Sequence, residues 1–104
     1  MTDVDFGTYH HSTPEESKRI REDAAKAFSK LLRPLYPPGA ALRILDAGCG
    51  LGFLTAVAAR CFPEASITGV DLFRPGSMSE LSMDKAVENM KALGIDSENV
   101  VLQA

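Results

Sequence analysis

The feature that most constrains this chain is the stretch from Arg43 to Phe53, which reads Arg-Ile-Leu-Asp-Ala-Gly-Cys-Gly-Leu-Gly-Phe. A short apolar run with the length of a buried strand leads into three glycines at alternate positions, and a segment rich in small residues follows. This pattern predicts a strand, a tight turn and the start of a helix. Such a junction presents unpaired backbone N–H groups and the positive end of a helix dipole, so we expect it to bind a small molecule.

The composition indicates one small globular domain. Of the 104 residues, 45% are hydrophobic and 24% are charged, which suits a chain with a single core. A net charge of -3 without a long basic run gives no general attraction to nucleic acid or to an anionic membrane. The start of the chain does not resemble a signal peptide, so we expect a cytoplasmic protein. Cys49 and Cys61 lack Cys-x-x-Cys spacing, and we expect reduced thiols and no metal site.

The N-terminal part predicts a flexible lead-in followed by a helix. Residues 1–12 show no periodicity, and we expect His10 and His11 to be exposed, with a lid formed by residues 9–11 as the less favoured alternative. Residues 13–16 read Thr-Pro-Glu-Glu, a capping box that begins a helix over residues 13–36. One apolar stripe of this helix is expected to contact the core: Ile20, Ala24, Ala27, Phe28, Leu31 and Leu32.

The remaining segments predict alternating strands and helices. Residues 43–46, 66–70 and 99–103 have the pattern of strands, whereas residues 51–62 and a segment that begins after Ser82 and ends at Gly94 have the pattern of helices. A strand, a helix and a second strand in this order predict parallel pairing with a right-handed crossover.

Two carboxylates are expected to meet beside the glycine turn. Asp46 precedes the turn and Asp71 follows the next strand, and the carboxyl ends of parallel strands share one edge of a sheet. A dinucleotide favours Gly-x-Gly-x-x-Gly, but Phe53 occupies the sixth position here. Asp46 would also repel a pyrophosphate by about 1 to 4 kcal/mol at about 4 Å. An amino acid head group suits the site better, with its ammonium near Asp46, its carboxylate near the helix N-terminus and a ribose at Asp71.

These residues resemble the class I S-adenosylmethionine-dependent methyltransferases. Residues 45–52 are similar to the first motif of that family, and residues 69–72, Gly-Val-Asp-Leu, are similar to its second acidic signature. The resemblance covers residues 41–104 and implies an α/β, three-layer Rossmann-like fold. It implies a truncated parallel sheet of about three strands in the order 3-2-1, with flanking helices and an extra N-terminal helix, all within a partial domain of residues 13–104. It also implies S-adenosylmethionine as cofactor, with S-adenosylhomocysteine as product. The implied binding residues are Asp46, Ala47, Gly48, Cys49, Gly50, Gly52, Phe53, Asp71 and Leu72.

The resemblance stops before the family's later strands, which carry the substrate pocket and most catalytic groups. We therefore expect the cofactor-binding half of a methyltransferase, inactive as an isolated chain, with a small-molecule acceptor favoured and no residue assigned as catalytic base. Two alternatives stay open: a fragment that binds an NAD-type cofactor, and a non-catalytic module that assembles with itself. The apolar edge of the first strand predicts a homodimer, formed through residues 43–46 or by exchange of the N-terminal helix.

Overall fold

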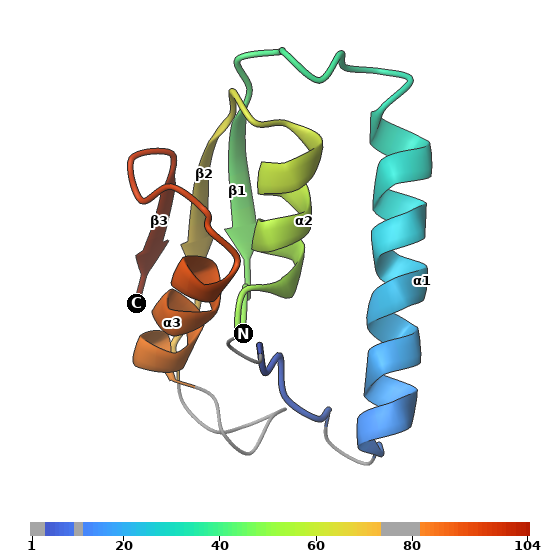
Figure 1. Ribbon diagram of the computed structural model, residues 1–104, viewed down its shortest axis with the longest axis vertical. Coiled ribbons are helices and arrows are strands. Elements are labelled where there is room, and N and C mark those ends of the chain that lie inside the picture. The colour runs from blue at the N-terminus through green and yellow to red at the C-terminus, as the bar shows by residue number, and fades with distance from the viewer. Residues whose placement is uncertain (1–3, 10–11, 74–81) are drawn as a thin grey trace.

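The computed structural model describes residues 4–9, 12–73 and 82–104 (Figure 1). His10, His11 and residues 74–81 of the loop after the second strand lie outside the described residues. Every helix and strand predicted from the sequence is present, within a few residues of its expected bounds. In chain order the elements are α1 (Pro14–Leu32), β1 (Arg43–Ala47), α2 (Phe53–Cys61), β2 (Ser66–Val70), α3 (Met83–Ala92) and β3 (Val100–Gln103).

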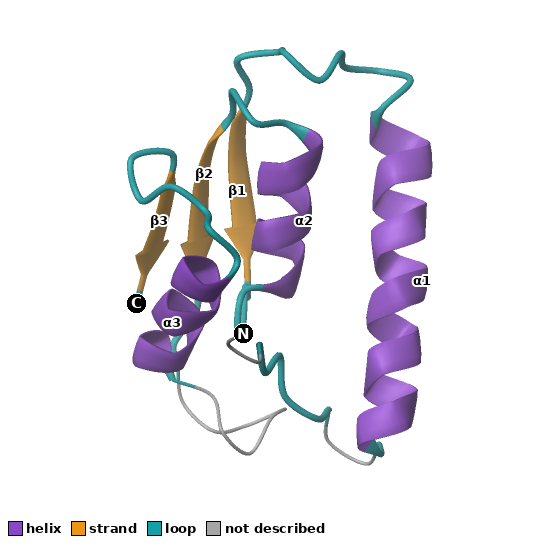
Figure 2. Cartoon of the chain, viewed as in Figure 1, coloured by secondary structure: helices purple, strands orange, loops and turns teal. Residues whose placement is uncertain are grey.

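The three strands form a parallel sheet in the order β1-β2-β3, which confirms the predicted order 3-2-1. Both crossovers move in the same direction along the sheet, so right-handed connections place α2 and α3 on the same face (Figure 2). On the opposite face Leu45 is 67% exposed and Val101 is 46% exposed. In the described part of the chain, helices therefore cover only one face of the sheet. The predicted three-layer fold would also have helices on the opposite face, and the described residues supply none there.

The core lies between the sheet and the helices α2 and α3. Phe62 and Ile67 are almost completely buried there, together with Met90 from α3. Burial of each such side chain contributes about 1.5 to 3 kcal/mol. Ala56 and Ala58 of α2 are small enough to let the helix approach the sheet closely.

Helix α1 begins as predicted but ends earlier than predicted. The Thr13 hydroxyl accepts a hydrogen bond from the Glu16 N–H at 3.1 Å, which confirms Thr13 as the N-cap. The helix ends at Leu32 rather than at residue 36. Pro34 explains the difference, because a proline inside the helix would remove a backbone donor and clash with the preceding turn.

The face that α1 presents to the rest of the protein is rotated from the predicted one. Phe28 and Leu32 pack against the core as expected, but Ile20 is 52% exposed and Leu31 is 67% exposed. Ser17 is instead the fully buried residue of the helix. The helix packs beside α2 and not on the sheet, so a narrow strip of its surface is covered (Figure 1). None of the helices in the described part has the length and apolar character needed to cross a bilayer.

Candidate functional site

The glycine turn between β1 and α2 lies at the carboxyl end of the sheet (Figure 1). The N–H groups of Gly48 and Cys49 both donate to the Val70 carbonyl, at 2.7 and 3.0 Å. These two bonds attach the turn to the end of the neighbouring strand. The turn is therefore held at the carboxyl end of the sheet, where ligands bind in open α/β sheets.

Helix α3 supports the turn from its other side. Gly52 adopts a φ of 95°, in the left-handed region, and a Cβ atom built there would lie 2.6 Å from Cε of Met90. Only glycine allows this conformation and this approach without strain. The next contact is polar, since the Asn89 side-chain amide donates to the Leu51 carbonyl at 3.0 Å. The turn thus lies between the sheet and α3.

Asp71 follows β2 and reaches back to the turn. One carboxylate oxygen accepts the Gly50 N–H at 3.0 Å, and the other accepts the Phe73 N–H at 2.9 Å. Phe73 has a φ of 55°, a left-handed conformation that is uncommon for a large residue. Each carboxylate oxygen has a further lone pair, so Asp71 can still accept hydrogen bonds from the hydroxyl groups of a ligand.

Asp46, near the end of β1, is oriented from within α2. The Thr55 hydroxyl, which is fully buried, donates to the Asp46 carboxylate at 2.7 Å. This charge-assisted bond fixes the carboxylate at the base of the turn. Asp46 and Asp71 thus both lie at the turn, as the sequence predicted.

Cys49 has no features of a nucleophile. Its side chain packs against Gly69 of β2, where an added Cβ would lie 3.0 Å from the sulfur. Burial, and then the negative charges of Asp46 and Asp71, raise the pKa of the Cys49 thiol to about 11. The thiol is therefore neutral at physiological pH, and the site around it has a negative potential.

The backbone donors of the turn are less available than the sequence suggested. Besides Gly48 and Cys49, the Gly50 N–H is bonded to Asp71, and the Gly52 N–H donates to the Cys49 carbonyl at 3.0 Å. The first turn of α2 can instead offer donors, because its N–H groups have no partner within the helix. Gly52 is the N-cap of this helix, and no side chain caps its N-terminus.

Three further residues that the resemblance implies differ in their exposure and packing. Ala47 is exposed at the end of β1, and Leu72 is 76% exposed after β2, so both side chains are open to a ligand or to solvent. Phe53, the first residue of α2, packs edge-on against Phe6 with ring centroids 5.2 Å apart.

Sequence reasoning did not single out Thr55 or Asn89. Asn89 falls on the apolar face of α3, between Ala86 and Met90, and it is only 4% exposed. A polar residue on an apolar helix face is a signal that could have marked it, because buried amides need hydrogen-bond partners. Within the described residues, no group of three or more histidines, cysteines or carboxylates is arranged to hold a metal ion.

Comparison with known proteins gives a consistent set of relatives. No protein-family model matches the chain. A malonyl-[acyl-carrier protein] O-methyltransferase of Bacillus cereus is 27% identical over 81 residues, which are 78% of this chain and 29% of the relative. The enzyme of the same name from Priestia megaterium is 42% identical over 52 residues, which are 50% of this chain and 18% of the relative. The chain thus spans less than a third of the length of these relatives.

Solved structures share the fold. A crystal structure of coclaurine N-methyltransferase bound to N-methylheliamine and SAH superimposes with a TM-score of 0.56 and 20% identity, over 92% of this chain and 24% of that one. The crystal structure of the YcgJ protein of Bacillus subtilis superimposes with a TM-score of 0.54 and 20% identity, over 80% of this chain and 30% of that one. The relatives and the fold confirm the resemblance to class I methyltransferases, of which this chain corresponds to the N-terminal part.

Proposed function

We propose that this chain is the cofactor-binding part of an S-adenosylmethionine-dependent methyltransferase. The resemblance of the glycine turn, the relatives' names and the shared fold support this proposal. Because the chain spans less than a third of its relatives' length, we propose that it binds the cofactor but does not transfer a methyl group alone.

The observation that carries the proposal is the grouping of two carboxylates with an uncapped helix N-terminus. Asp46 and Asp71 lie at the glycine turn, and the N-terminus of α2 offers its donors beside them. S-adenosylmethionine has a cationic ammonium and sulfonium, an anionic carboxylate and a neutral ribose. In the proposed complex Asp46 attracts the ammonium, the start of α2 binds the carboxylate, and Asp71 accepts the ribose hydroxyls. The remaining implied contacts are with Ala47, Cys49, Phe53 and Leu72.

The negative potential at the turn disfavours the dinucleotide alternative. The raised pKa of the Cys49 thiol has the charges of Asp46 and Asp71 among its causes, so an anion placed beside this thiol meets the same repulsion. A pyrophosphate brings two negative charges, whereas S-adenosylmethionine has a net positive charge. The electrostatics therefore support the sulfonium nucleoside.

The bound cofactor supplies an activated methyl group on its sulfonium. The residues of this chain bind and orient the cofactor, which sets the direction in which the methyl group faces an acceptor. We keep a small molecule as the proposed acceptor. The described residues give no reason to assign a catalytic base among them, and the neutral Cys49 thiol is a poor candidate for one. A cytoplasmic location also stays a prediction, which cell fractionation tests.

Isothermal calorimetry with S-adenosylhomocysteine and, separately, with NAD tests the proposal. We expect one S-adenosylhomocysteine bound per chain and no heat of binding with NAD. Binding of NAD alone would instead support a nucleotide-cofactor fragment. Binding of neither compound would support a non-catalytic module.

We also propose that the chain forms a homodimer through the free edge of β1. In the described residues β1 pairs only with β2, which leaves its other edge without a strand, and Leu45 on the uncovered face beside this edge is 67% exposed. An apolar strand edge favours pairing with a second copy. Exchange of α1 is the alternative, although Phe28 and Leu32 pack within their own chain here. Light scattering at high micromolar concentration tests both routes, and a strict monomer would contradict them.

A further inference from the structure

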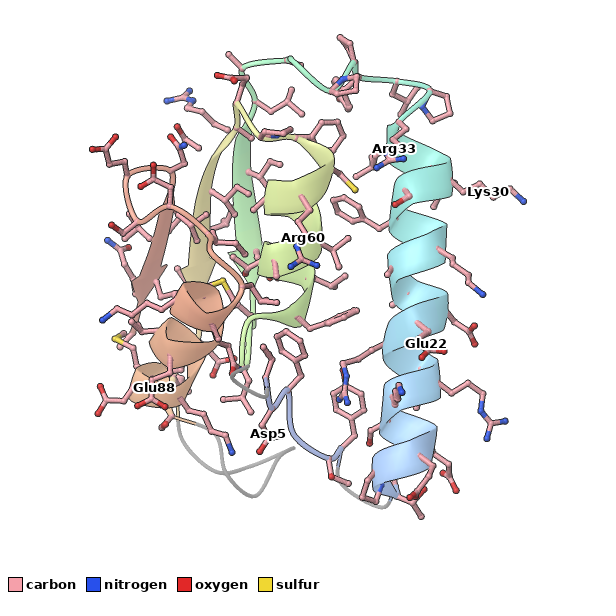
Figure 3. All side chains as sticks on the ribbon, in the orientation of Figure 1. Asp5, Glu22, Lys30, Arg33, Arg60 and Glu88 are labelled. Carbon is pink, nitrogen blue, oxygen red and sulfur yellow. The ribbon has the colours of Figure 1, made fainter. Side chains whose placement is uncertain are left out.

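Residues 4–9, which we call the strap, cross from α1 to α3 past the start of α2. Figure 3 shows Asp5 on this segment, below α2 and between the two outer helices. At the α1 end, the Arg21 guanidinium donates to the Gly7 carbonyl at 2.8 Å and lies over the rings of Phe6 and Tyr9, 5.9 and 5.7 Å from their centroids. The Tyr9 N–H donates to the hydroxyl of Ser17 at 2.9 Å. The strap is thus fastened to α1 by polar and cation–π contacts.

At the α3 end, the strap is bound by Asn89. The Asn89 amide nitrogen donates to the Asp5 carbonyl at 2.9 Å, and the Asn89 amide oxygen accepts the Asp5 N–H at 3.3 Å. The same nitrogen donates to the Leu51 carbonyl of the glycine turn at 3.0 Å. Both donors of one buried amide are therefore used, one on the strap and one on the turn. An ion pair between Lys85 of α3 and Asp5 also joins this end of the strap to the helix.

Apolar contacts join the same two segments. Leu51, at the centre of the glycine turn, is 2% exposed because Phe6 and Tyr9 of the strap pack against it together with Phe73. Phe6 also packs on Phe53, the residue that opens α2. The strap therefore covers the turn, and a change in the position of either segment disturbs the contacts of the other.

We propose that Asn89 is a positioning residue that couples the strap to the cofactor turn, so that docking of the strap and binding of the cofactor strengthen each other. This inference rests on the proposed function of the turn. Asn89 and Arg21 act through the turn and the strap, and neither needs to contact the cofactor. Coupling of this kind is reciprocal: the factor by which a docked strap tightens cofactor binding equals the factor by which the cofactor tightens docking. Typical coupling changes affinity about 5- to 150-fold.

The first test uses Arg21→Ala, which loosens the strap from α1 without touching the turn. Arg19→Ala, on an exposed position of the same helix, is the matched control. We expect Arg21→Ala to weaken binding of S-adenosylhomocysteine about 5-fold or more, measured by calorimetry, and Arg19→Ala to leave it unchanged. Equal affinity in both variants and the wild type would overturn the coupling.

The second test follows the strap directly by hydrogen exchange of the Tyr9 amide, which is bonded to Ser17 in the docked state. In the wild type, S-adenosylhomocysteine is expected to slow this exchange. In Asn89→Ala the ligand is expected to lose that effect, even at concentrations that saturate the variant. A residue with a purely structural role would lower stability but leave the ligand's effect on Tyr9 intact, and that result would contradict the proposal.

The outcomes separate this inference from the proposed function. If the wild type binds S-adenosylhomocysteine but Tyr9 exchange does not respond to it, the coupling is wrong and the cofactor assignment stands. If the wild type does not bind the compound, the cofactor assignment itself fails. Arg21 lies on α1 and contacts the strap from the side away from α3. Its variant therefore tests the coupling even if Asn89→Ala does not fold.

Discussion

Replacing Asp71 with alanine tests the site at a residue that bonds both to the glycine turn and to Phe73. The Asp71 carboxylate accepts the N–H groups of Gly50 and Phe73, and we propose that it also accepts the ribose hydroxyls of the cofactor. A hydrogen bond to a charged group contributes about 1.5 to 3 kcal/mol. Loss of one such bond to the ribose corresponds to binding that is about 10- to 150-fold weaker.

The same substitution should also lower the stability of the unliganded protein. Gly50 is buried, so its N–H group would lose its partner with little access to water. Leaving a buried donor unpaired costs about 1 to 3 kcal/mol, which a urea titration can measure. Asp71→Asn removes the charge but keeps the shape of the side chain and one acceptor oxygen. Its NH2 group then faces one of the two backbone N–H groups, so the urea titration is made on this variant as well.

Calorimetry with S-adenosylhomocysteine gives the affinity of each variant. Glu64→Gln is the control, because this exposed acid lies in the turn before β2, at the opposite end of that strand. We expect the control to bind like the wild type and Asp71→Asn to bind more weakly than the wild type. Affinity of Asp71→Ala within about twofold of the wild type would remove Asp71 from the site and refute this reasoning.

Three further predictions concern the turn. Gly52→Ala should lower the free energy of unfolding by about 1 to 3 kcal/mol in urea titration, because the residue has a φ of 95° and faces a methionine of α3. Thr55→Val should lower the free energy of unfolding by about 1 to 3 kcal/mol in the same assay, because the Asp46 carboxylate loses its donor. An unchanged free energy of unfolding would mean that this hydrogen bond does not stabilise the fold. Alkylation of Cys49 by iodoacetamide should be very slow at pH 8, because its raised pKa keeps the thiol neutral, and its rate should rise about tenfold per pH unit until about pH 11. Rapid alkylation of the folded chain at pH 8 would contradict this pKa.

The sheet and the helices were predictable because their signals are local. The segment 43–53 has a strand length, a glycine turn and a helix start in direct succession, and Ser66–Val70 was predicted with its observed bounds. The face of α1 was not predictable in the same way. Its exposed Ile20 and Leu31 match a helical stripe as well as Phe28 does, and only the position of α2 decides which of these residues is covered.

The positions of the acids and glycines at the turn were predictable, but those of the residues that support the turn were not. Asp46 and Asp71 come together because parallel strands end at one edge, which the order of elements already implies. The role of Asn89 depends on a contact with Asp5, far away in the sequence, and no local pattern reveals it. The bonding of Gly50 to Asp71 is likewise a long-range contact, which is why the turn was expected to have more unpaired donors than it has.

The main proposal is that the turn binds a nucleoside with an amino acid head group and not a dinucleotide. Amide NMR of the ¹⁵N-labelled chain, titrated with S-adenosylhomocysteine and in a parallel sample with NAD, tests it most directly. We expect saturating shifts at the amides of Gly50, Phe53 and Asp71 with S-adenosylhomocysteine and none with NAD. Shifts of these amides with NAD, and their absence with S-adenosylhomocysteine, would contradict it.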